Sequence, residues 1–478
     1  MSDTIVKDPA WETEVIMQDG TLEKLFHLRE NGTTVKTEIM AGITTFMTMA
    51  YILAVNPSIL SVTGMDKGAL LTVTALASCF ATLLMATFAN YPFALSAGMG
   101  LNAFFAFTVV KQMGYSWEMA LAAVCVEGLI FIVLSLTNIR QAVFDVIPLS
   151  LKRAVSVGIG LFIALIGLFN AQIIVGNPAT KIALFNFKQS MAGGTFHTVG
   201  ITVLLAIIGI VITGIMLARD VKGGILWGIL ATWILGILCE VTGLYVPNPK
   251  VGAFSVLPDF SAGLASFLPA DPSPIFLKLD FSKVASLDFL VIVMSFLFVD
   301  FFDTLGTLMG VASKANMLRK DGTLPNIKGA LMADSVGTVA GALMGTSTIT
   351  TFVESASGVS EGGRTGLTAV TTAVLFFLSL FLSPFFMAIP AFATAPALVM
   401  VGFLMVSSIS QIDFRNLPEA IPAYMCIIAM PFAYSISEGI SFGIISYVLV
   451  NTLTGHTSRV SLLLYILAVI FIAKYVLI

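Results

Sequence analysis

Apolar segments of about twenty residues follow one another along the chain, the length that crosses a bilayer as a helix. A first set of seven is predicted at 38–60, 69–90, 94–112, 118–137, 150–170, 197–217 and 223–243. A second set of seven is predicted at 286–312, 327–345, 350–361, 366–389, 394–410, 418–435 and 437–453. Some of these elements are too short to cross alone. A last apolar run occupies 460–478.

This pattern predicts an all-α polytopic membrane protein in five parts. A polar segment at 1–37 precedes a first repeat at 38–243, and a second repeat fills 286–453. Between the repeats, the Pro-rich stretch 244–285 is too polar and broken to span, and we expect an extracellular loop. A hydrophobic segment at 454–478 ends the chain. Because each repeat has an odd number of elements, the second is inserted upside down, an arrangement typical of transporters.

Composition and charge support a membrane protein. Hydrophobic residues make up 57% of the chain and charged residues only 11%, against about 25% charged in soluble domains. Lys and Arg gather in connections on one side, for example Lys152, Arg153, Arg219 and Lys222, which places the N-terminus in the cytoplasm. The net charge of −3 and the lack of a basic tract argue against a nucleic-acid partner.

The sequence has no enzyme signature that we can identify. It contains no phosphate-binding loop, nucleophile elbow or zinc-protease motif. Its four cysteines and three histidines lack metal-ligand spacing. We therefore expect no metal, no cofactor and no catalytic residues, and an intramembrane enzyme is the least favoured function.

Three carboxylates lie in stretches predicted to be inside the membrane. Asp300 and Asp303 stand in VIVMSFLFVDFFDTLGTLMG, and Glu354 stands in TSTITTFVESASGVSEGG. A charged residue at a helix centre costs about 2.5–3.5 kcal/mol on insertion scales, so such a group normally faces a cavity and carries protons, ions or substrate. The alternative is a carboxylate used in helix packing or at a pore rim.

Asp300 and Asp303 are three residues apart and should share one helical face. Neighbouring carboxyls in an apolar, Phe-rich setting can take up and release a proton near neutral pH. Asp300, Asp303 and Glu354 are therefore candidates for both substrate binding and proton coupling. The phenylalanines could stack on a flat heteroaromatic ligand, although lipid contact is the simpler explanation for most of them.

The third element of each repeat has an unusual composition. Residues 90–110 and 345–366 each begin with Pro, Thr or β-branched residues and continue with small ones. This predicts discontinuous helices that line a cavity, with close helix packing as the alternative. Substrate-binding candidates on these elements are Asn102, Thr351 and Ser355, although Asn102 could equally form a helix–helix hydrogen bond. In the first span, Phe46 and Tyr51 are candidates for stacking.

Four stretches carry a family resemblance: AGITTFMTMAYILAVNP (41–57), LSAGMGLNAFFAF (95–107), VDFFDTLGTLMGVA (299–312) and TTFVESASGVSEGGRTGLTA (350–369). They resemble the AzgA-like purine permeases. This is the guanine/hypoxanthine/adenine branch of the nucleobase–cation symporters related to xanthine–uracil permeases. The resemblance extends from about Lys36 to His456. The run 460–478 departs from the fourteen-element plan and leaves the side of the C-terminus open.

The resemblance implies a seven-plus-seven inverted-repeat fold. Elements 1–4 and 8–11 would form a core domain, elements 5–7 and 12–14 a gate domain, and short antiparallel strands in elements 3 and 10 would frame the substrate. Asp303, Asp300, Glu354 and Asn102 match the family's functional positions. Family members are thought to be homodimers with an elevator-like movement of the core.

The expected function is import of purine nucleobases across the cell membrane by proton symport. Guanine and hypoxanthine are the expected substrates, with adenine a further candidate. A xanthine/uracil-type permease and a purine-binding membrane receptor that does not transport are the alternatives. A sulfate or bicarbonate carrier is less favoured because the candidate site is acidic. The preferred purine, and H⁺ against Na⁺ as the coupled ion, stay open at this point.

Overall fold

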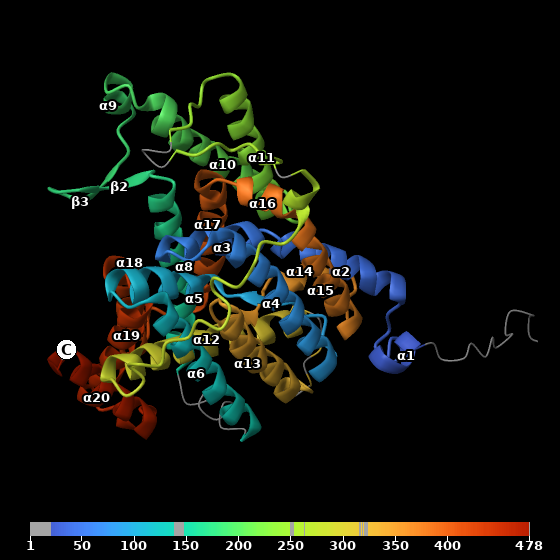
Figure 1. Ribbon diagram of the computed structural model, residues 1–478. Coiled ribbons are helices and arrows are strands. Elements are labelled where there is room, and N and C mark those ends of the chain that lie inside the picture. The colour runs from blue at the N-terminus through green and yellow to red at the C-terminus, as the bar shows by residue number, and fades with distance from the viewer. Residues whose placement is uncertain are drawn as a thin grey trace, which may run out of the picture.

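The computed structural model describes residues 21–137, 148–248, 253–261, 263–314, 317, 319 and 324–477, so residues 1–20 of the predicted N-terminal segment lie outside the described part. It is an assembly of packed helices with two small pairs of strands (Figure 1). Within the described residues, eight helical segments are long and apolar enough to cross a membrane. The multi-spanning helical architecture predicted from hydrophobicity is confirmed.

The first seven predicted elements all form close to their predicted limits. They are α2 Val35–Met49 with α3 Ile52–Leu60 and η1 Ser61–Thr63; α4 Lys67–Phe88; β1 Leu95–Ala97 with α5 Met99–Ala103 and the π-helix η2 Phe104–Gln112; α6 Trp117–Leu136; α8 Leu149–Asn170; η3 Phe196–Gly200 with α10 Ile201–Ala218; and α11 Gly224–Val241.

The second seven follow in the same way. They are α12 Leu287–Lys314; α13 Ile327–Met344; β4 Ile349–Thr351 with α14 Ser355–Ser360; α15 Gly366–Ser379 with η6 Leu380–Leu382 and α16 Ser383–Ala388; α17 Ala391–Val406 with η7 Ser407–Gln411; α18 Leu417–Phe432; and α19 Ile436–Leu453. After η8 Thr457–Arg459, the last apolar run forms the helix α20 Leu462–Leu477, which packs on α19.

The connections contain structure that hydrophobicity does not predict. A short helix, α1 Thr21–Phe26, precedes the first span. Between α8 and α10, the strands β2 Ile174–Asn177 and β3 Lys181–Leu184 form an antiparallel hairpin, followed by α9 Phe187–Ala192. The long connection before α12 contains the short helix η5 Gly263–Phe267.

The long connection before α12 also carries three exposed aspartates in tight turns. Asp259 and Asp280 each accept a hydrogen bond from the backbone N–H of the serine two residues ahead, and this bond lowers the pKa of each carboxyl. Asp271 accepts bonds from the hydroxyl and the N–H of Ser273, which lower its pKa likewise. These carboxylates therefore stay charged at neutral pH and keep the connection in water.

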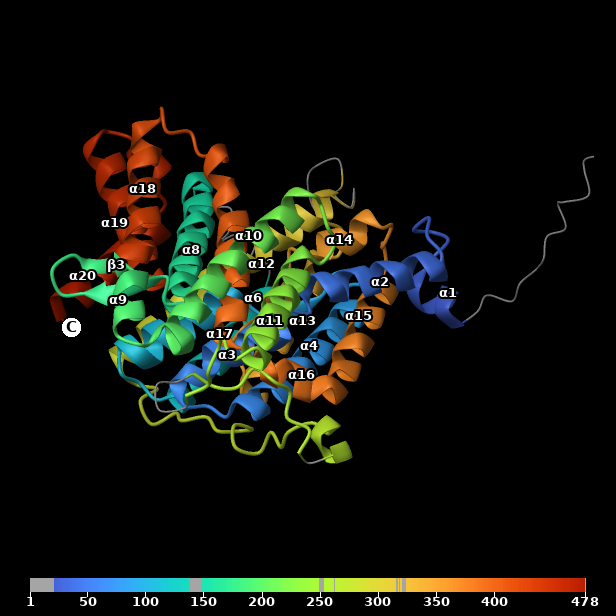
Figure 2. The ribbon, with the colours of Figure 1, turned by 90° about the horizontal axis from the view of Figure 1, so that it is seen from above.

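The helices pack in two groups. The first contains α2, α3, α4, α6, α12, α13, α14 and α15, and the second contains α8, α10, α11, α17, α18 and α19. Seen from above, α8, α18 and α19 gather on one side and α2, α14 and α15 on the other (Figure 2). This division places elements 1–4 and 8–11 together and elements 5–7 and 12–14 together, as the core and gate of the expected fold require. We call the first set of helices the core group and the second set the gate group.

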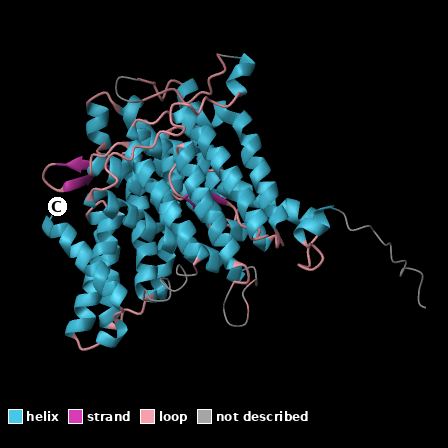
Figure 3. Ribbon diagram, turned by 60° about the horizontal axis from the view of Figure 1, so that its bottom comes forward, coloured by secondary structure: helices cyan, strands magenta, loops and turns pink. Residues whose placement is uncertain are grey.

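At the centre of the core group, the two predicted broken elements meet as strands (Figure 3). β1 and β4 run antiparallel, with Leu95 opposite Thr351 and Ala97 opposite Ile349. The ladder continues at both ends, since Phe352 N–H donates to the carbonyl of Ala94 and Gly98 N–H donates to that of Thr348. A strand pair buried among helices explains why the β4 segment, Ile349–Thr351, consists of β-branched residues rather than helix formers.

The outer edges of this strand pair are completed by threonine hydroxyls from neighbouring helices. Thr82 of α4 accepts from Leu95 N–H at 3.0 Å and donates to its carbonyl at 3.1 Å. Thr338 of α13 donates to the carbonyl of Ile349 at 2.8 Å. α4 and α13 are the second elements of their repeats, so each strand is supported by the helix that precedes it. In a membrane interior these bonds replace the water that an exposed strand edge would need.

A buried glutamate at the start of the first span organises the start of α15. Glu38 is fully buried and accepts hydrogen bonds from the N–H groups of Arg364 at 2.8 Å and Thr368 at 3.1 Å, and from the Thr368 hydroxyl at 2.6 Å. A carboxylate that satisfies free N–H groups at a helix start is a strong cap. Glu38 therefore fastens the first element of one repeat to the fourth element of the other.

We predict that Glu38→Ala destabilises the protein. The change strands several buried donors, so the expected loss is roughly 2–4 kcal/mol of unfolding free energy. Thermal unfolding of the purified protein in detergent measures it. Glu30→Ala is the matched control, because Glu30 is exposed and has only a 3.7 Å ion pair with His27. Equal melting temperatures for the two variants would contradict the capping role of Glu38.

Candidate functional site

The centre of the candidate site is a hydrogen bond between a tyrosine of the first repeat and a glutamate of the second. Glu354 follows β4 and lies at the start of α14, where its Oε1 accepts a 2.6 Å hydrogen bond from the hydroxyl of Tyr51. Tyr51 is buried at the break between α2 and α3. Next to Glu354, Val353 is 53% exposed although β4 itself is buried, so this segment borders an accessible space.

Asp303 joins this pair from α12. The side chain is half-buried, and its Oδ2 lies 3.6 Å from the position that a Cβ on Gly98 would occupy. It is close enough to act electrostatically on both Tyr51 and Glu354. Asp303, Glu354 and Tyr51 thus converge beside the ends of β1 and β4. They offer two carboxyl groups and a phenol hydroxyl, which together can bind a ligand that has several N–H donors.

Asp300 points to a different place. It is fully buried, its Oδ1 accepts a 2.9 Å hydrogen bond from Thr304, and its carboxyl is in hydrogen-bond contact with that of Glu127 on α6. Residues three apart on a helix differ in direction by about 60°. That is enough here to direct Asp303 toward Tyr51 and Glu354 and Asp300 toward Glu127, while Asp334 of α13 acts electrostatically on Asp303 as well.

The predicted polar residues of the broken elements make contacts with the protein itself. Asn102 is fully buried, and its Oδ1 accepts a hydrogen bond from Ser347 on the segment before β4. The hydroxyl of Ser355 accepts a 3.0 Å bond from Ala94 N–H. Both bonds tie the third element of one repeat to that of the other. The structure therefore places Asn102 and Ser355 in the frame of the site.

The remaining two candidates lie in the walls near the site. Thr351 is 2% exposed at the end of β4. Phe46 of α2 is half-buried and packs edge-on against Phe376 of α15, with ring centroids 5.2 Å apart. The two rings are nearly perpendicular, the T-shaped arrangement that aromatic pairs favour.

Sequence reasoning missed two buried carboxylates. Glu127 of α6 and Asp334 of α13 are fully buried inside predicted spans and belong to the cluster around Asp300. The signal that found Asp300, Asp303 and Glu354, a carboxylate within an apolar segment, applies equally to these two.

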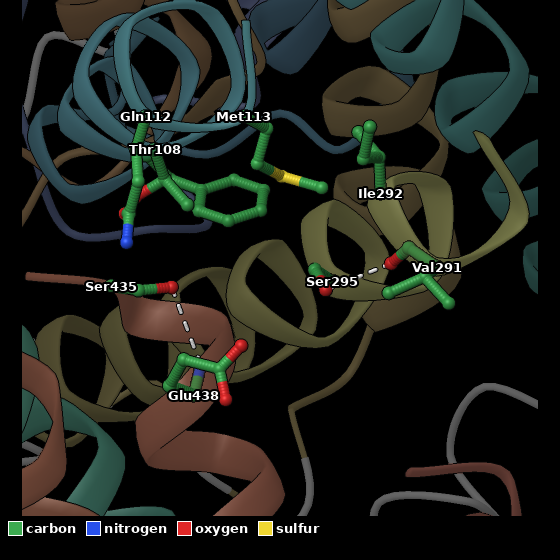
Figure 4. A pocket seen from close by; sticks show the side chains of 9 residues that line it. Thr108, Gln112, Met113, Val291, Ile292, Ser295, Ser435 and Glu438 are labelled. Carbon is green, nitrogen blue, oxygen red and sulfur yellow. Dashed lines mark hydrogen bonds between the residues drawn. The ribbon is translucent and has the colours of Figure 1, made fainter. Parts of the chain in front are cut away.

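A pocket of about 180 Å³ lies between the core and gate groups (Figure 4). Its lining comes from η2, the first turns of α12 and the start of α19: Phe104, Thr108, Gln112, Met113, Val291, Ile292, Ser295, Ser435 and Glu438. Phe104 connects it to the core, since its ring packs at 4.8 Å on Phe296. Glu438 connects it to the extra helix, since it accepts a hydrogen bond from Tyr475 of α20. The pocket does not include Asp303 or Glu354.

Comparison with known proteins agrees with this architecture. A family model described as "Permease family" matches residues 36–442. The chain belongs to this permease family. It is 47% identical over 95% of its length to a permease of Methanocaldococcus jannaschii, of which it covers 98%. It is 40% identical to the adenine permease AdeP of Escherichia coli, with 96% of both chains covered.

A further relative of the permease is the guanine/hypoxanthine permease PbuO of Bacillus subtilis. The two are 40% identical over 94% of this chain and 98% of PbuO. Family membership identifies the chain as a multi-pass membrane transporter rather than an enzyme.

Solved structures show the fold of the permease. The transmembrane domain of the cyanobacterial bicarbonate transporter BicA superposes with a TM-score of 0.60 at 18% identity, over 85% of this chain and 97% of that one. The murine anion transporter Slc26a9 gives a TM-score of 0.61 at 12% identity, and the match covers 95% of this chain and 77% of Slc26a9. The seven-plus-seven inverted-repeat fold predicted from the sequence is confirmed.

We predict that Gly98→Ala distorts the site. An added Cβ would lie 2.7 Å from Thr350 Cγ2 and 2.9 Å from Leu101 Cδ1, so these two side chains would have to shift at the strand ends. Overpacking of this kind costs roughly 1–3 kcal/mol, which thermal unfolding in detergent detects. Gly176→Ala in β2 is the control, because a Cβ there meets nothing within 4 Å. A Gly98→Ala protein as stable as this control would show that the strand ends are not tightly packed.

Proposed function

We propose that the permease imports purine nucleobases, guanine and hypoxanthine above all and adenine as a further candidate, by proton symport. The observation that carries this proposal is the convergence of Asp303 and Glu354, with Tyr51, at the ends of the paired strands. Relatives named as adenine and guanine/hypoxanthine permeases match nearly the whole chain and support the same substrate class.

The chemistry of the site suits a purine. The ring N–H groups of guanine and hypoxanthine are donors, and carboxylates accept such bonds with charge-assisted strength. In this proposal Glu354 and Asp303 accept from the base, while the Tyr51 hydroxyl keeps Glu354 oriented. Asn102, Thr351 and Ser355 hold the strand ends in position or complete the polar contacts, and Phe46 supplies aromatic surface. An acidic site of this kind is a poor match for a sulfate or bicarbonate ion.

We further propose that transport occurs by an elevator-like movement of the core group against the gate group. The strand pair and both site carboxylates belong to the core group, and the pocket of Figure 4 lies at the border between the two groups. A movement along this border would carry the site while the gate stays in the bilayer. The permease would act in the cell membrane, as a homodimer with its N-terminus in the cytoplasm.

The direct test of substrate binding is uptake of radiolabelled hypoxanthine by cells that express Glu354→Gln. Loss of a charge-assisted hydrogen bond costs roughly 1.5–3 kcal/mol, so uptake at low substrate concentration should fall roughly 10- to 150-fold. Tyr51→Phe should cause a smaller loss, because it removes only the group that orients Glu354.

Glu361→Gln is the matched control for Glu354→Gln. Glu361 lies in the same segment but forms an ion pair with Lys222. Hypoxanthine uptake by Glu361→Gln should therefore stay close to that of the wild type. Wild-type uptake by Glu354→Gln would overturn the role of Glu354. A competition panel of unlabelled guanine, hypoxanthine, adenine, xanthine and uracil ranks the substrates. Strong competition by uracil or xanthine alone would instead indicate a xanthine/uracil-type permease.

Proton coupling predicts that uptake depends on a pH gradient. In proteoliposomes, accumulation of hypoxanthine should be driven by an acidic exterior and should collapse with a protonophore. One proton per substrate supports about tenfold accumulation for each pH unit. Substrate that binds but never enters the vesicles would identify a receptor instead of a transporter. Accumulation that follows a Na⁺ gradient and ignores pH would exclude proton symport.

A further inference from the structure

A second cluster of carboxyl groups is connected through threonines to β4 and the segment before it, and its Asp334 is close enough to act electrostatically on Asp303. It consists of Glu127 on α6, Asp300 on α12 and Asp334 on α13, and all three side chains are completely buried. Threonine hydroxyls connect its members. Thr304 lies between Asp300 and Asp334, and Thr348, just before β4, donates to Glu127 Oε2 at 3.1 Å. We call this group the acidic trio.

The hydrogen bonds of Thr304 are strongest with a proton that no side chain in its usual charge state provides. Its Oγ1 lies 2.9 Å from Asp300 Oδ1, 3.0 Å from Asp334 Oδ1 and 2.8 Å from Thr350 Oγ1. A hydroxyl has one hydrogen to donate and two lone pairs that accept. Thr304 can donate to one aspartate and accept from Thr350. With both aspartates ionised they share one hydrogen in a weaker bifurcated bond, whereas protonation of one carboxyl lets it donate to Thr304 and gives two full hydrogen bonds.

The environment of Glu127 leads independently to the same conclusion. Its carboxyl is in hydrogen-bond contact with that of Asp300, and two ionised carboxylates cannot make such a bond because neither has a hydrogen. Its Oε1 is buried and has no donor among the described residues. A buried acceptor without a donor is costly unless a ligand supplies one. Here a single hydrogen ion fits between the two groups.

Among the described residues, the charged groups that act on Glu127 most strongly are both acidic. The charged groups that act on it are Asp300, from α12, and Asp334, from α13. The segment before β4 adds only the neutral hydroxyl of Thr348. Ion pairs formed by the described residues, such as His27 with Glu30 and Lys222 with Glu361, lie elsewhere. Like charges this close and this deeply buried cannot all be ionised, so protons are needed for the observed contacts.

We propose that Glu127, Asp300 and Asp334 form a proton-binding site that is separate from the carboxylates that bind substrate. This inference rests on the proposed function and deepens it. It assigns the coupled ion to the acidic trio and the nucleobase to Asp303, Glu354 and Tyr51. In each cycle a proton from water on one side forms an O–H bond with a carboxylate oxygen of the trio. The bond breaks and the proton leaves to water on the other side, with no other change in the protein.

The two sites share the strand pair, so proton binding and substrate binding can be coupled. Thr348 bonds to Glu127 by its hydroxyl and accepts from Gly98 N–H by its carbonyl, beside the carboxylate of Asp303. Thr350 in β4 bonds to Thr304. When the trio loses its proton, repulsion between Glu127 and Asp300 acts on the segment that holds β4. The strand geometry around Asp303 is therefore most stable when the trio is protonated.

The test compares Glu127→Gln with the wild type in proteoliposomes. Glutamine has the shape of a protonated glutamate and cannot release a proton. Radiolabelled hypoxanthine should therefore still exchange across the membrane at equal concentrations. Accumulation driven by a gradient of one pH unit should fall from about tenfold to about onefold. Proton entry on addition of hypoxanthine, followed with a pH-sensitive dye inside the vesicles, should disappear. Asp334→Asn should behave alike, and serves if the first variant does not fold.

Glu118→Gln provides the matched control, because Glu118 lies on α6 near its start and outside the trio. It should keep both accumulation and proton entry. An infrared measurement on the wild type gives a second readout, since a protonated carboxyl has a C=O band that Glu127→Gln should remove at neutral pH. Normal accumulation and proton entry in Glu127→Gln would overturn the proton site but leave the proposed function standing. A wild-type protein that moves no purine would overturn the proposed function itself.

Discussion

An extended segment in the middle of a membrane protein has to find hydrogen-bond partners inside the protein, because hydrocarbon provides none. This constraint governs the structure. β1 and β4 satisfy each other along one edge, and Thr82 and Thr338 satisfy their outer edges. Four elements, two from each repeat, are thereby fixed around one point. The candidate side chains Asp303, Glu354 and Tyr51 lie close to the ends of the paired strands.

The same arrangement separates two kinds of carboxyl group that the sequence places side by side. Asp303 faces Tyr51 and Glu354, next to an accessible segment. Asp300 faces Glu127 in a fully buried cluster. One helix, α12, thus presents acids to two environments of different polarity, and β4 lies against both. In the proposed mechanism the proton site and the substrate site would therefore be in contact through a few residues of β4 and the segment before it.

Much of the fold could be predicted from the sequence, because hydrophobic length reports directly on membrane spans. The broken elements were also predictable, since Thr and β-branched residues around Ile349–Thr351 are unusual in a lipid-facing helix. The directions in which the side chains point were not predictable from the sequence. The split between Asp300 and Asp303 depends on which helices pack on α12, and no local pattern contains that information. The bond of Asn102 to Ser347 is likewise a contact between distant segments. The hairpin β2–β3 was missed because each strand has only four residues, too few to give a recognisable alternation of apolar and polar positions.

The support of the strand pair by Thr82 and Thr338 bears on how substrate selectivity and transport rate are related. Both threonines lie on helices of the core group, so the strand pair they support needs nothing from the gate group to keep its shape. If the proposed substrate site is correct, it lies within the core group alone, and the pocket at the border with the gate group is lined by other side chains. Residues that choose the ligand and residues that set the turnover rate then belong to different surfaces. Evolution could change the substrate of such a protein without retuning its motion, which suits a scaffold shared by carriers of unrelated solutes.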